Sequence, residues 1–439
     1  MTESDRLLKA RQAMQAAGCW SPNQQMGSRW PIGCVALEIT QRCNLDCTLC
    51  YLSEHSEAVH DIPLAEIWRR IDLIDQYYGK NTDVQISGGE PTLRDKQELL
   101  AIVRRLRALG MRPTLMTNGK RVTRSLLEAL AAAGLMDIAF HIDTTQQLKG
   151  YASEVELNAL RQRYIDRAVG LPISVFFNAT IHQGNFHEIP GLVRFFQHNA
   201  GKVRTVSFQL QADTGRGVAG QRDVLITPDS VTEQIQLGAA ATINFSGSLT
   251  GHPACNRYGL CLAVNGNLYD LLDDAEFIGR LQTATAHLTL DRARPYRTVL
   301  RFAGWLATQP RHFWSVFGWG ISKLWRMKRD LWAARGRVHT LSFFIHNFMD
   351  AGSLDAERIH ACVFKTMTQQ GPVSMCLHNA KRDEYILQPV VIPTPSGKRL
   401  WRPLTGQFDE TPNSPQAVTA YSLKRLKGRA RKRWLESEG

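Results

Sequence analysis

Three cysteines within one short segment are the most reactive feature of this sequence. Cys43, Cys47 and Cys50 follow a buried apolar segment at residues 35–40, and their spacing allows one loop to bring the three thiols together. Iron–sulfur clusters usually take four thiolates, so three would leave one iron with an open coordination site. A zinc site and buried structural thiols are the alternative interpretations of three nearby cysteines.

Polar and glycine residues recur at the ends of the next predicted strands. Gly88-Gly89-Glu90 follows the strand at residues 84–86, and Asn118, Asp143 and Asn178 lie at the ends of the third, fourth and fifth strands. Because the carboxyl ends of barrel strands meet at one mouth, we expect these residues to surround the cysteine loop. Taken singly, each group is also an ordinary turn or helix cap.

Apolar periodicity predicts the elements that position these residues. Strands are expected at residues 35–40, 84–86, 112–117, 138–143, 173–181 and 205–211. Helices are expected between them, at residues 64–78, 96–109, 125–133, 155–169 and 189–199. This alternation predicts an α/β fold with a parallel sheet, either doubly wound or curled into a barrel. A partial (β/α)6 TIM-like barrel is favoured, because the chemical residues follow successive strands.

The βα alternation divides the chain into four predicted parts. Residues 1–32 form an N-terminal lead-in, and 33–230 form the core domain. Residues 231–395 form an auxiliary metal-site region, which includes a Trp-rich basic insert at about 300–337. A basic C-terminal tail at 396–439 completes the chain.

A second set of cysteines lies in the auxiliary region. Cys255, Cys261, Cys362 and Cys376 are enough for a complete four-thiolate site, which would hold an auxiliary [4Fe-4S] cluster or zinc. The alternative is four independent buried cysteines. Cys19 and Cys34 have no evident partners, and we interpret both as structural.

Composition limits the cellular setting. Nine cysteines, an odd number with three close together, suit metal ligation in a reducing cytoplasm better than a disulfide framework. We expect no secretion signal near Met1, and the apolar stretches are too short or too interrupted to span a bilayer. The net charge of +13 predicts attraction to an anionic partner, which leaves nucleic acid, lipid headgroups and an acidic substrate open.

The insert at about 300–337 has a pattern of its own. Its apolar residues recur at helical spacing among Lys and Arg: Trp314, Phe317, Ile321, Leu324, Trp325 and Leu331. A basic helix with tryptophans is typical of membrane-surface contact, so we expect a cytoplasmic protein with peripheral membrane or lipid contact as one hypothesis. The alternative is an amphipathic helix packed on the barrel.

The cysteine loop, Cys43-Asn-Leu-Asp-Cys47-Thr-Leu-Cys50, resembles the CxxxCxxC motif of the radical S-adenosylmethionine (SAM) superfamily. Ser87-Gly88-Gly89-Glu90-Pro91-Thr92 is similar to the GGEP motif of that superfamily. The resemblance implies a catalytic [4Fe-4S] cluster on the three cysteines, with SAM bound to its open iron. It also implies reductive cleavage of SAM to a 5′-deoxyadenosyl radical, which removes a hydrogen atom from an unactivated carbon.

The same resemblance implies roles for the surrounding residues. Gly88, Gly89 and Glu90 would bind SAM, and Asn118, Asp143 and Asn178 would contact its carboxylate, ribose or methionine part. The position before the third cysteine, often aromatic in the superfamily, is Leu49 here, and Tyr51 follows the loop as a further expected cofactor contact. A low-potential electron donor such as flavodoxin or ferredoxin is implied as a partner.

Residues 348–379, which contain Cys362 and Cys376, resemble the C-terminal part of the tetraether lipid synthase group of radical SAM proteins. This resemblance implies a lipid or another apolar substrate. We therefore expect a radical SAM enzyme that acts on an unactivated carbon. Modification of a peptide or RNA is the alternative reaction, and a non-catalytic Fe–S electron-transfer or scaffold protein is the alternative class.

Overall fold

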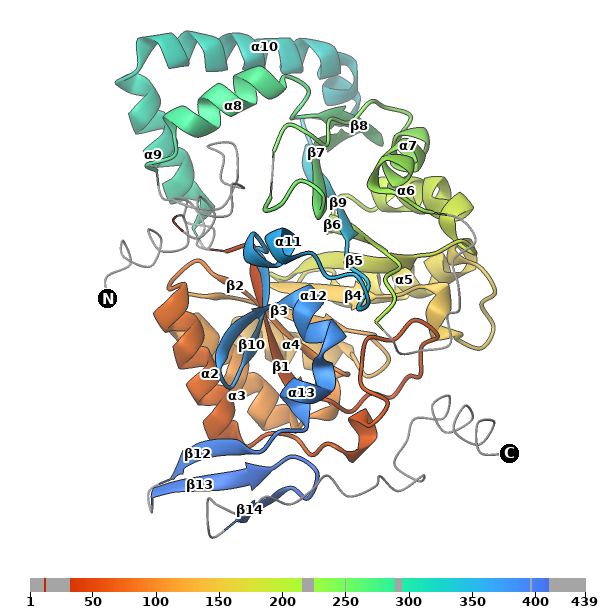
Figure 1. Cartoon of the computed structure of the whole chain (residues 1–439). Helices are drawn as coiled ribbons and strands as arrows, with labels where there is room; N and C mark the ends of the chain where they lie inside the picture. Colours follow the sequence, from red (N-terminus) through yellow and green to blue (C-terminus); the bar gives the residue numbers. More distant parts are fainter. Residues whose placement is uncertain are drawn as a thin grey trace.

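A computed structural model describes residues 12, 32–214, 225–248, 250–288, 294–394 and 397–409. Its first half alternates strands with helices as the apolar periodicity predicts (Figure 1). The strands are β1 (Cys34–Thr40), β2 (Asp83–Gly88), β3 (Arg112–Thr117), β4 (Asp137–His141), β5 (Ser174–Ile181) and β6 (Val203–Leu210). The helices between them are α2 (Leu64–Tyr77), α3 (Lys96–Ala108), α4 (Arg124–Ala133), α5 (Glu154–Ala168) and α6 (Ile189–His198). The predicted boundaries agree with these to within a few residues.

The sheet is larger than the first half of the chain. Strands β1 to β6 pair in chain order, each parallel to the next. The parallel part continues through β10 (Phe364–Thr368) beside β1 and β9 (His339–Asn347) beside β6. Antiparallel strands flank it: β11 (Gly371–Ser374) beside β10, and β7 (Asn256–Val264) with β8 (Asn267–Asp270) beside β9.

The predicted α/β fold class with a parallel sheet is confirmed, and a partial TIM-like barrel is consistent with the strand order. The sheet adds β9 and β10 to the six strands expected. Both come from beyond residue 230, so strands from either side of that predicted domain boundary share one sheet. The boundary itself stays a prediction.

The remaining elements follow β6 in the chain. They are α7 (Pro228–Ala239), α8 (Ala275–Ala284), α9 (Pro295–Ala307), α10 (Pro310–Ala333), α11 (Ala356–His360), α12 (Met375–Ala380), α13 (Arg382–Ile386), β12 (Val390–Thr394), β13 (Gly397–Arg402) and β14 (Gln407–Asp409). Helices α8 to α10 lie at one end of the molecule, and the β12–β14 sheet lies at the other, next to α2 (Figure 1). The Trp-rich insert is therefore two helices, with α10 beginning at Pro310.

Local sequence explains why the core elements begin and end where they do. All seven residues of β1 are buried, as expected for a strand covered on both faces. Side chains of Asp95, Thr123 and Ser153 accept hydrogen bonds from the first turns of α3, α4 and α5. Gly134 ends α4 in the left-handed conformation. The caps fix where the helices begin, and the parallel pairing of β1 to β6 places the carboxyl end of each strand at the same side of the sheet.

Several predicted features lie outside the described residues. These are Cys19, most of the N-terminal lead-in, and the part of the basic tail after residue 409. Among the described residues, no helix is both long and apolar enough to cross a membrane.

Candidate active site

A cavity of about 230 Å³ lies where the carboxyl ends of the parallel strands meet. Cys43, Cys47 and Cys50 all line this cavity, so the fold brings the three thiols of the cysteine loop to one space. Six other predicted site residues line the same cavity: Tyr51, Gly88, Gly89, Glu90, Asn118 and Asn178. The cavity therefore unites nearly all of the site predicted for the first half of the chain.

Gly88 and Gly89 pack against the backbone that leads into the cysteine loop. The amide of Gly89 donates to the carbonyl oxygen of Thr40 at 2.9 Å. A Cβ on Gly88 would overlap the carbonyl oxygen of Thr40, and a Cβ on Gly89 would overlap that of Arg42. Gly88 also has a φ of +120°, which side chains rarely adopt. Both positions therefore require glycine to seat the cysteine loop on the end of β2.

Two further hydrogen bonds tie the cysteine loop to the neighbouring strand ends. Nδ2 of Asn118, directly after β3, donates to Oδ1 of Asn44 at 2.6 Å. The backbone amide of Thr48 donates to the carbonyl oxygen of Thr145, after β4, at 2.9 Å. The loop is thus held by β2, β3 and β4 at once, which fixes the direction of its thiols.

The carboxylate of Glu90 is fully buried and internally bonded. Oε1 accepts from the amide and hydroxyl of Thr92 at 3.1 and 2.6 Å, and from the hydroxyl of Thr117 at 2.7 Å. Oε2 accepts from the backbone amide of Asn118 at 2.8 Å. A SAM amine at Glu90 would have to compete with these four hydrogen bonds. The arrangement instead suits Glu90 to joining the ends of β2 and β3.

Asp143 does not line the cavity, in contrast to the place expected for it. Its Oδ1 accepts from the amide of Thr145 at 3.0 Å, and its Oδ2 accepts from the amide of Thr180 at 2.7 Å. Oδ2 also lies 2.8 Å from Nε2 of His141. Burial alone would raise the pKa of Asp143, but the charge of His141 and these hydrogen bonds hold that pKa well below its usual value. The carboxylate is thus already satisfied by protein groups.

His141 takes the place at the cavity wall that was expected for Asp143. Burial alone would lower the pKa of His141, but the charge of Asp143 and the hydrogen bond between them raise it above its usual value. Several other polar wall residues were not predicted: Gln85, Gln146, Thr180 and Gln209. Gln85, Thr180 and Gln209 lie on β2, β5 and β6, so a strand position facing the same side as Asn178 was the signal that could have found these three.

Gln146 contributes an acceptor to the cavity. Its Nε2 donates to the carbonyl oxygen of His141 at 2.6 Å, which fixes the orientation of the amide. Its Oε1 is buried and has no hydrogen-bond partner among the described residues. A buried acceptor of this kind is costly unless a bound molecule satisfies it, so the cavity wall suits a ligand that carries an N–H or O–H donor.

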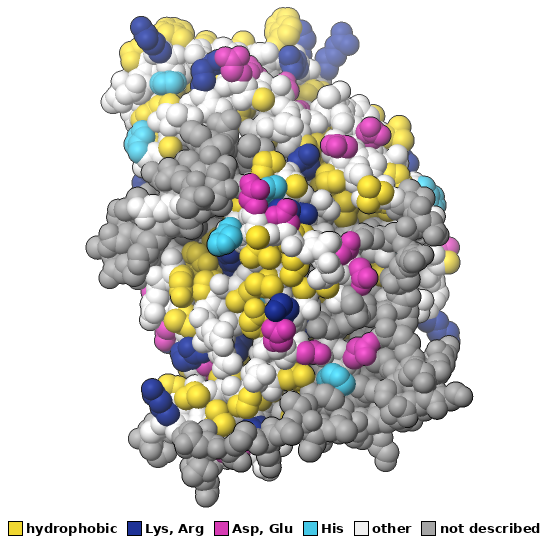
Figure 2. Space-filling model, in the orientation of Figure 1, with side chains coloured by type: hydrophobic (Ala, Val, Ile, Leu, Met, Phe, Trp, Pro, Cys, Tyr) yellow, Lys and Arg dark blue, Asp and Glu magenta, His cyan; other side chains and the backbone are white. Residues whose placement is uncertain are grey.

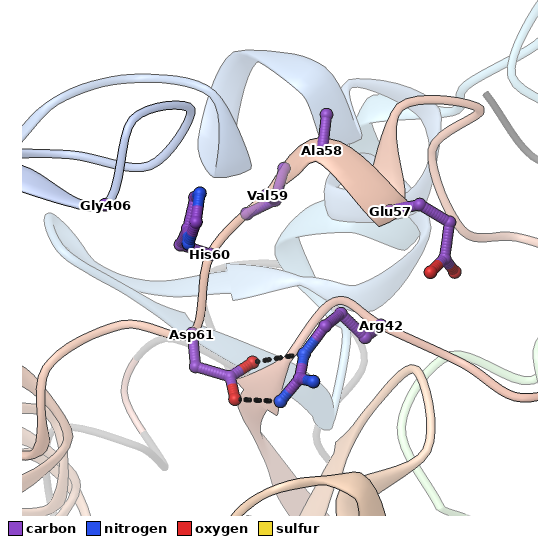
Figure 3. A pocket seen from close by; sticks show the side chains of 7 residues that line it. All are labelled: Arg42, Glu57, Ala58, Val59, His60, Asp61 and Gly406. Carbon is purple, nitrogen blue, oxygen red and sulfur yellow. Dashed lines mark hydrogen bonds and ion pairs between the residues drawn. The ribbon is translucent and has the colours of Figure 1, made fainter. Parts of the chain in front are cut away.

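A more open pocket of about 540 Å³ lies beside the start of the cysteine loop (Figure 3). In it, the guanidinium of Arg42 faces the carboxylate of Asp61, and Nε lies 3.3 Å from Oδ1. The hydroxyl of Thr40 donates to the same carboxylate at 2.6 Å. No predicted site residue lines this pocket. We therefore interpret the ion pair with Asp61 as holding Arg42, the residue before Cys43, in place.

A buried ion pair joins the first strand to the C-terminal helices. Arg382, the first residue of α13, donates from Nη2 to Oε1 of Glu38 on β1, and both side chains are buried. Burial alone would raise the pKa of Glu38, but the charges of Arg382 and His378 lower it to about 2. The Arg382 guanidinium also covers the ring of Tyr51, whose hydroxyl donates to the carbonyl oxygen of Gly88 at 2.9 Å. The C-terminal segment therefore packs onto the cysteine loop.

A second, smaller cavity contains three of the four C-terminal cysteines, Cys255, Cys362 and Cys376. Nε of Arg358 donates to Sγ of Cys255 at 3.3 Å, and the backbone amide of Met349 donates to Sγ of Cys376 at 3.5 Å. Two histidines that the sequence analysis did not select also line this cavity, His252 and His346. Phe348, Met375 and Cys376 line both this cavity and the larger one, so the two spaces share a wall.

Cys261 is separate from the other three cysteines. It lies within β7, where it pairs with Leu341 of β9 and Asp270 of β8, and burial raises the pKa of its thiol. Cys255 precedes the first residue of β7, and six residues of extended chain span roughly 20 Å, too far for one metal ion or cluster. The expectation of a single site with four cysteines is therefore wrong for Cys261.

The role of these thiol groups as metal ligands stays a prediction, which rests on their donor chemistry and on the cavities that they share. Within the described ranges, no group of three or more His, Cys, Asp or Glu side chains stands in metal-binding geometry. Cys34 is also separate from the cysteine loop, since it is buried at the start of β1.

The fold and the cavity define an α/β protein with a three-thiol loop at the carboxyl edge of a parallel sheet. Residues 37–190 match the family model described as the Radical SAM superfamily. This part of the chain is therefore similar to the radical SAM superfamily, in agreement with the resemblance of the two sequence motifs.

Curated relatives match less than half of the chain. The sequence is 29% identical over 187 residues to 7,8-dihydro-6-hydroxymethylpterin dimethyltransferase of Methanocaldococcus jannaschii, covering 41% of this chain and 36% of the relative. It is 33% identical over 168 residues to PqqA peptide cyclase of Methylobacterium nodulans, covering 37% of this chain and 42% of the relative. The probable GTP 3′,8-cyclase of Pyrococcus abyssi is 29% identical over 189 residues, which cover 42% of this chain and 58% of the relative. The chain thus spans less than two thirds of each relative.

Solved structures give weaker matches. The crystal structure of Streptococcus suis SuiB bound to S-adenosylmethionine aligns with a TM-score of 0.35 and 18% identity, and the alignment covers 43% of each chain.

Proposed function

We propose that this protein is a radical SAM enzyme whose reaction takes place in the cavity of about 230 Å³ lined by the three loop cysteines. The observation that carries the proposal is that Cys43, Cys47 and Cys50 line the same cavity as the Gly88-Gly89 turn. When bound, a [4Fe-4S] cluster on these thiols and SAM would supply a 5′-deoxyadenosyl radical able to abstract hydrogen from an unactivated carbon.

The chain orients the thiols and the cofactor for this chemistry, and it keeps water away from the radical. Asn118 and Thr48 hold the cysteine loop through the hydrogen bonds described above, so that the thiols keep one direction. Tyr51, Asn178 and the backbone of Gly89 line the cavity as SAM-binding groups. Apolar residues on its walls exclude water from a reactive intermediate: Leu45, Leu49, Leu52, Leu210, Phe348 and Met349.

Other residues act through their neighbours. The carboxylate of Glu90 accepts a hydrogen bond from the backbone amide of Asn118, so we assign Glu90 the role of positioning Asn118. Asp143 holds His141 at the cavity wall, and this makes His141 rather than Asp143 the group that faces the ligand. The unpartnered Oε1 of Gln146 supplies an acceptor for a hydroxyl or amine of SAM.

The test is anaerobic. The cluster is reconstituted with iron and sulfide, SAM and dithionite are added, and 5′-deoxyadenosine is measured. Flavodoxin or ferredoxin is the alternative reductant. We expect product from the native chain and none from a Cys43→Ala/Cys47→Ala/Cys50→Ala variant. A Cys34→Ala variant is the matched control, since Cys34 is a buried thiol outside the cavity. If the native chain binds SAM and its reduced cluster forms no 5′-deoxyadenosine, the protein is a non-catalytic Fe–S protein instead.

We further propose that Cys255, Cys362 and Cys376 hold an auxiliary metal centre, an iron–sulfur cluster in preference to zinc. Three thiols line one cavity, and two of them accept hydrogen bonds, Cys255 from Arg358 and Cys376 from the amide of Met349, which suits thiolate ligands. Because Cys376 also lines the larger cavity, this centre would stand at the edge of the reaction space.

Iron content tests the auxiliary centre in the variant that lacks the loop cysteines. We expect residual iron, and we expect Cys255→Ala or Cys376→Ala to remove it. Cys261→Ala is the matched control and should leave the iron in place. Equal iron loss in all three variants would support the site with four cysteines. Zinc without iron in the native protein would show that the centre is a zinc site and not an iron–sulfur cluster.

For the substrate we propose a lipid or another apolar molecule, supported by the apolar side chains on the cavity wall. A peptide is the second candidate, because a relative that matches 37% of this chain is named PqqA peptide cyclase. Lipid and metabolite profiling of a gene-deletion strain separates them: an altered lipid class supports the first, and an unmodified peptide supports the second. Salt-sensitive RNA binding by the purified protein would favour RNA instead.

A further inference from the structure

Helix α10 has two different apolar faces. One face packs on the β7–β8 hairpin and α8 through Val316, Trp319 and Met327. On this face the ring of Trp319 stacks on that of Phe277 at 5.5 Å. Lys323 and Asp330 lie on the same face, where they bond to Asp270 and Tyr269. This side of α10 is therefore covered by the β7–β8 hairpin and α8.

The opposite face of α10 is apolar as well, and it is exposed. Trp314, Trp325 and Trp332 are 67%, 68% and 88% exposed. Phe317 and Ile321 continue the same row, since residues three or four apart share one side of a helix. A helix packed on its own domain would turn this row inward. Packing on the β7–β8 hairpin and α8 therefore explains the first apolar face, but it does not explain why the second face is apolar.

The charge on the two helices is almost entirely positive. Between residues 295 and 333 there are seven Lys or Arg residues and one acidic residue, Asp330. Asp330 faces inward, where Asn265, Asn267 and Tyr269 donate to its carboxylate. The outer side therefore carries cations: the ammonium of Lys328 lies over the ring of Trp325, and Arg329 is exposed beside it.

The position of α10 leaves this face accessible. The helix lies along one end of the molecule (Figure 1), and Figure 2 shows hydrophobic and Lys or Arg side chains together at that end. Helix α9 adds exposed apolar residues at the same end, Tyr296, Val299 and Leu300. A 24-residue helix is about 36 Å long, so the face can lie flat on a large surface.

We infer that the outer face of α9 and α10 docks on an anionic membrane surface. Tryptophan, with an apolar ring and a polar N–H, suits the boundary between headgroups and acyl chains, and Lys and Arg suit anionic headgroups. A second copy of this chain fits less well. A twofold contact through this face would bring like cations together with no acidic side chain to pair them.

Vesicle flotation of the reconstituted full-length protein tests this inference. We expect binding to phosphatidylcholine vesicles that contain phosphatidylserine, and weaker binding at high salt or without phosphatidylserine. A Trp314→Ser/Trp325→Ser/Trp332→Ser variant should bind on the order of tenfold more weakly or worse. Leu237→Ser, which changes an exposed apolar residue of α7, is the control and should bind normally.

Charge reversal provides an independent arm. Arg329→Glu should weaken binding roughly fivefold or more, since each cation near an anionic surface adds attraction. Arg104→Glu makes the same change in net charge on the exposed side of α3 and should have little effect. Circular dichroism confirms that each variant is folded.

Three results would overturn the inference. The first is that the native protein does not float, and the second is that the tryptophan variant floats as well as Leu237→Ser. The third is a concentration-dependent dimer in analytical ultracentrifugation that the tryptophan variant alone abolishes, which would assign the face to a second copy. Formation of 5′-deoxyadenosine in vesicle-free buffer is measured separately, so failure here leaves the proposed reaction standing.

Discussion

The guanidinium of Arg382 lies over the ring of Tyr51, with its Cζ atom 4.8 Å from the ring centroid. Tyr51 follows the third cysteine of the loop, whereas Arg382 begins a helix near the other end of the described chain. Glu38 of β1 holds Arg382 from the other side. Residues from β1 and the cysteine loop thus meet a residue more than 300 positions away at one buried charge pair.

Replacing Arg382 by methionine should lower the free energy of unfolding by up to about 3–5 kcal/mol, because the buried charge of Glu38 would lose its guanidinium partner and keep only Gln41 and His378. Urea denaturation of the reconstituted protein measures the loss. Arg399→Met is a matched control, since the Arg399 guanidinium lies over Phe408 at the same 4.8 Å, on the small β13–β14 hairpin. The double variant Glu38→Gln/Arg382→Met should regain part of the stability. Losses that simply add in the double variant would argue against coupling of the pair.

Acid should weaken the same pair. The pKa of Glu38 is about 2, below its ordinary value of 4.5, so its charge stabilises the fold fully above pH 4.5. That contribution is lost as the pH falls from 4.5 toward 2, because in this range the unfolded chain takes up a proton at Glu38 while the folded state still excludes it. The stability difference between the native chain and Glu38→Gln should therefore shrink across this window in thermal melts. A difference that stays constant with pH would contradict the assignment.

Gly89→Ala should abolish 5′-deoxyadenosine formation and destabilise the fold by about 1–3 kcal/mol or more, because the new methyl group would overlap the carbonyl oxygen of Arg42. Thermal unfolding and the SAM cleavage assay measure both effects. Gly304→Ala serves as the control, since a Cβ at this exposed position in α9 meets no atom within 4 Å. It should be neutral or stabilise by about 0.5–1 kcal/mol. Normal SAM cleavage by Gly89→Ala would remove the close-packing explanation.

Asp143→Asn should lower the pKa of His141, because the carboxylate charge and its hydrogen bond raise that pKa in the native protein. An NMR titration of the ring protons of His141, assigned with a His141→Asn variant, follows the shift. We also expect a loss of about 1–3 kcal/mol in stability, since an asparagine amide cannot accept all the bonds that the carboxylate accepts. An unchanged His141 pKa would show that Asp143 does not control the ring.

The local sequence was enough to predict the core of the site. Three cysteines at short spacing must lie in one loop, and period-two and period-3.6 apolar patterns locate the strands and helices around it. The parallel arrangement then brings Gly88, Asn118 and Asn178 to one edge whatever the details of packing. These inferences depend on neighbours in sequence, which is why they agree with the structure.

Residues whose role depends on distant partners could not be assigned in this way. Asp143 looked available to a ligand until Thr180 and His141 were seen to occupy its carboxylate. Cys261 looked equivalent to Cys255, yet the extended chain of β7 carries it away. Apolar spacing in α10 predicted a tryptophan row without showing whether the row was packed or exposed.

The sequence by itself determined the three-thiol loop, the glycine turn beside it and the alternating fold that supports them, because spacing along the chain controls each of these. Only the tertiary structure decided that β9 and β10 extend the sheet, that Arg382 covers Tyr51, and that Cys376 borders both cavities. Each of these results depends on contacts between segments far apart in sequence. Local periodicity cannot predict such contacts, because they depend on the packing and burial of the whole chain.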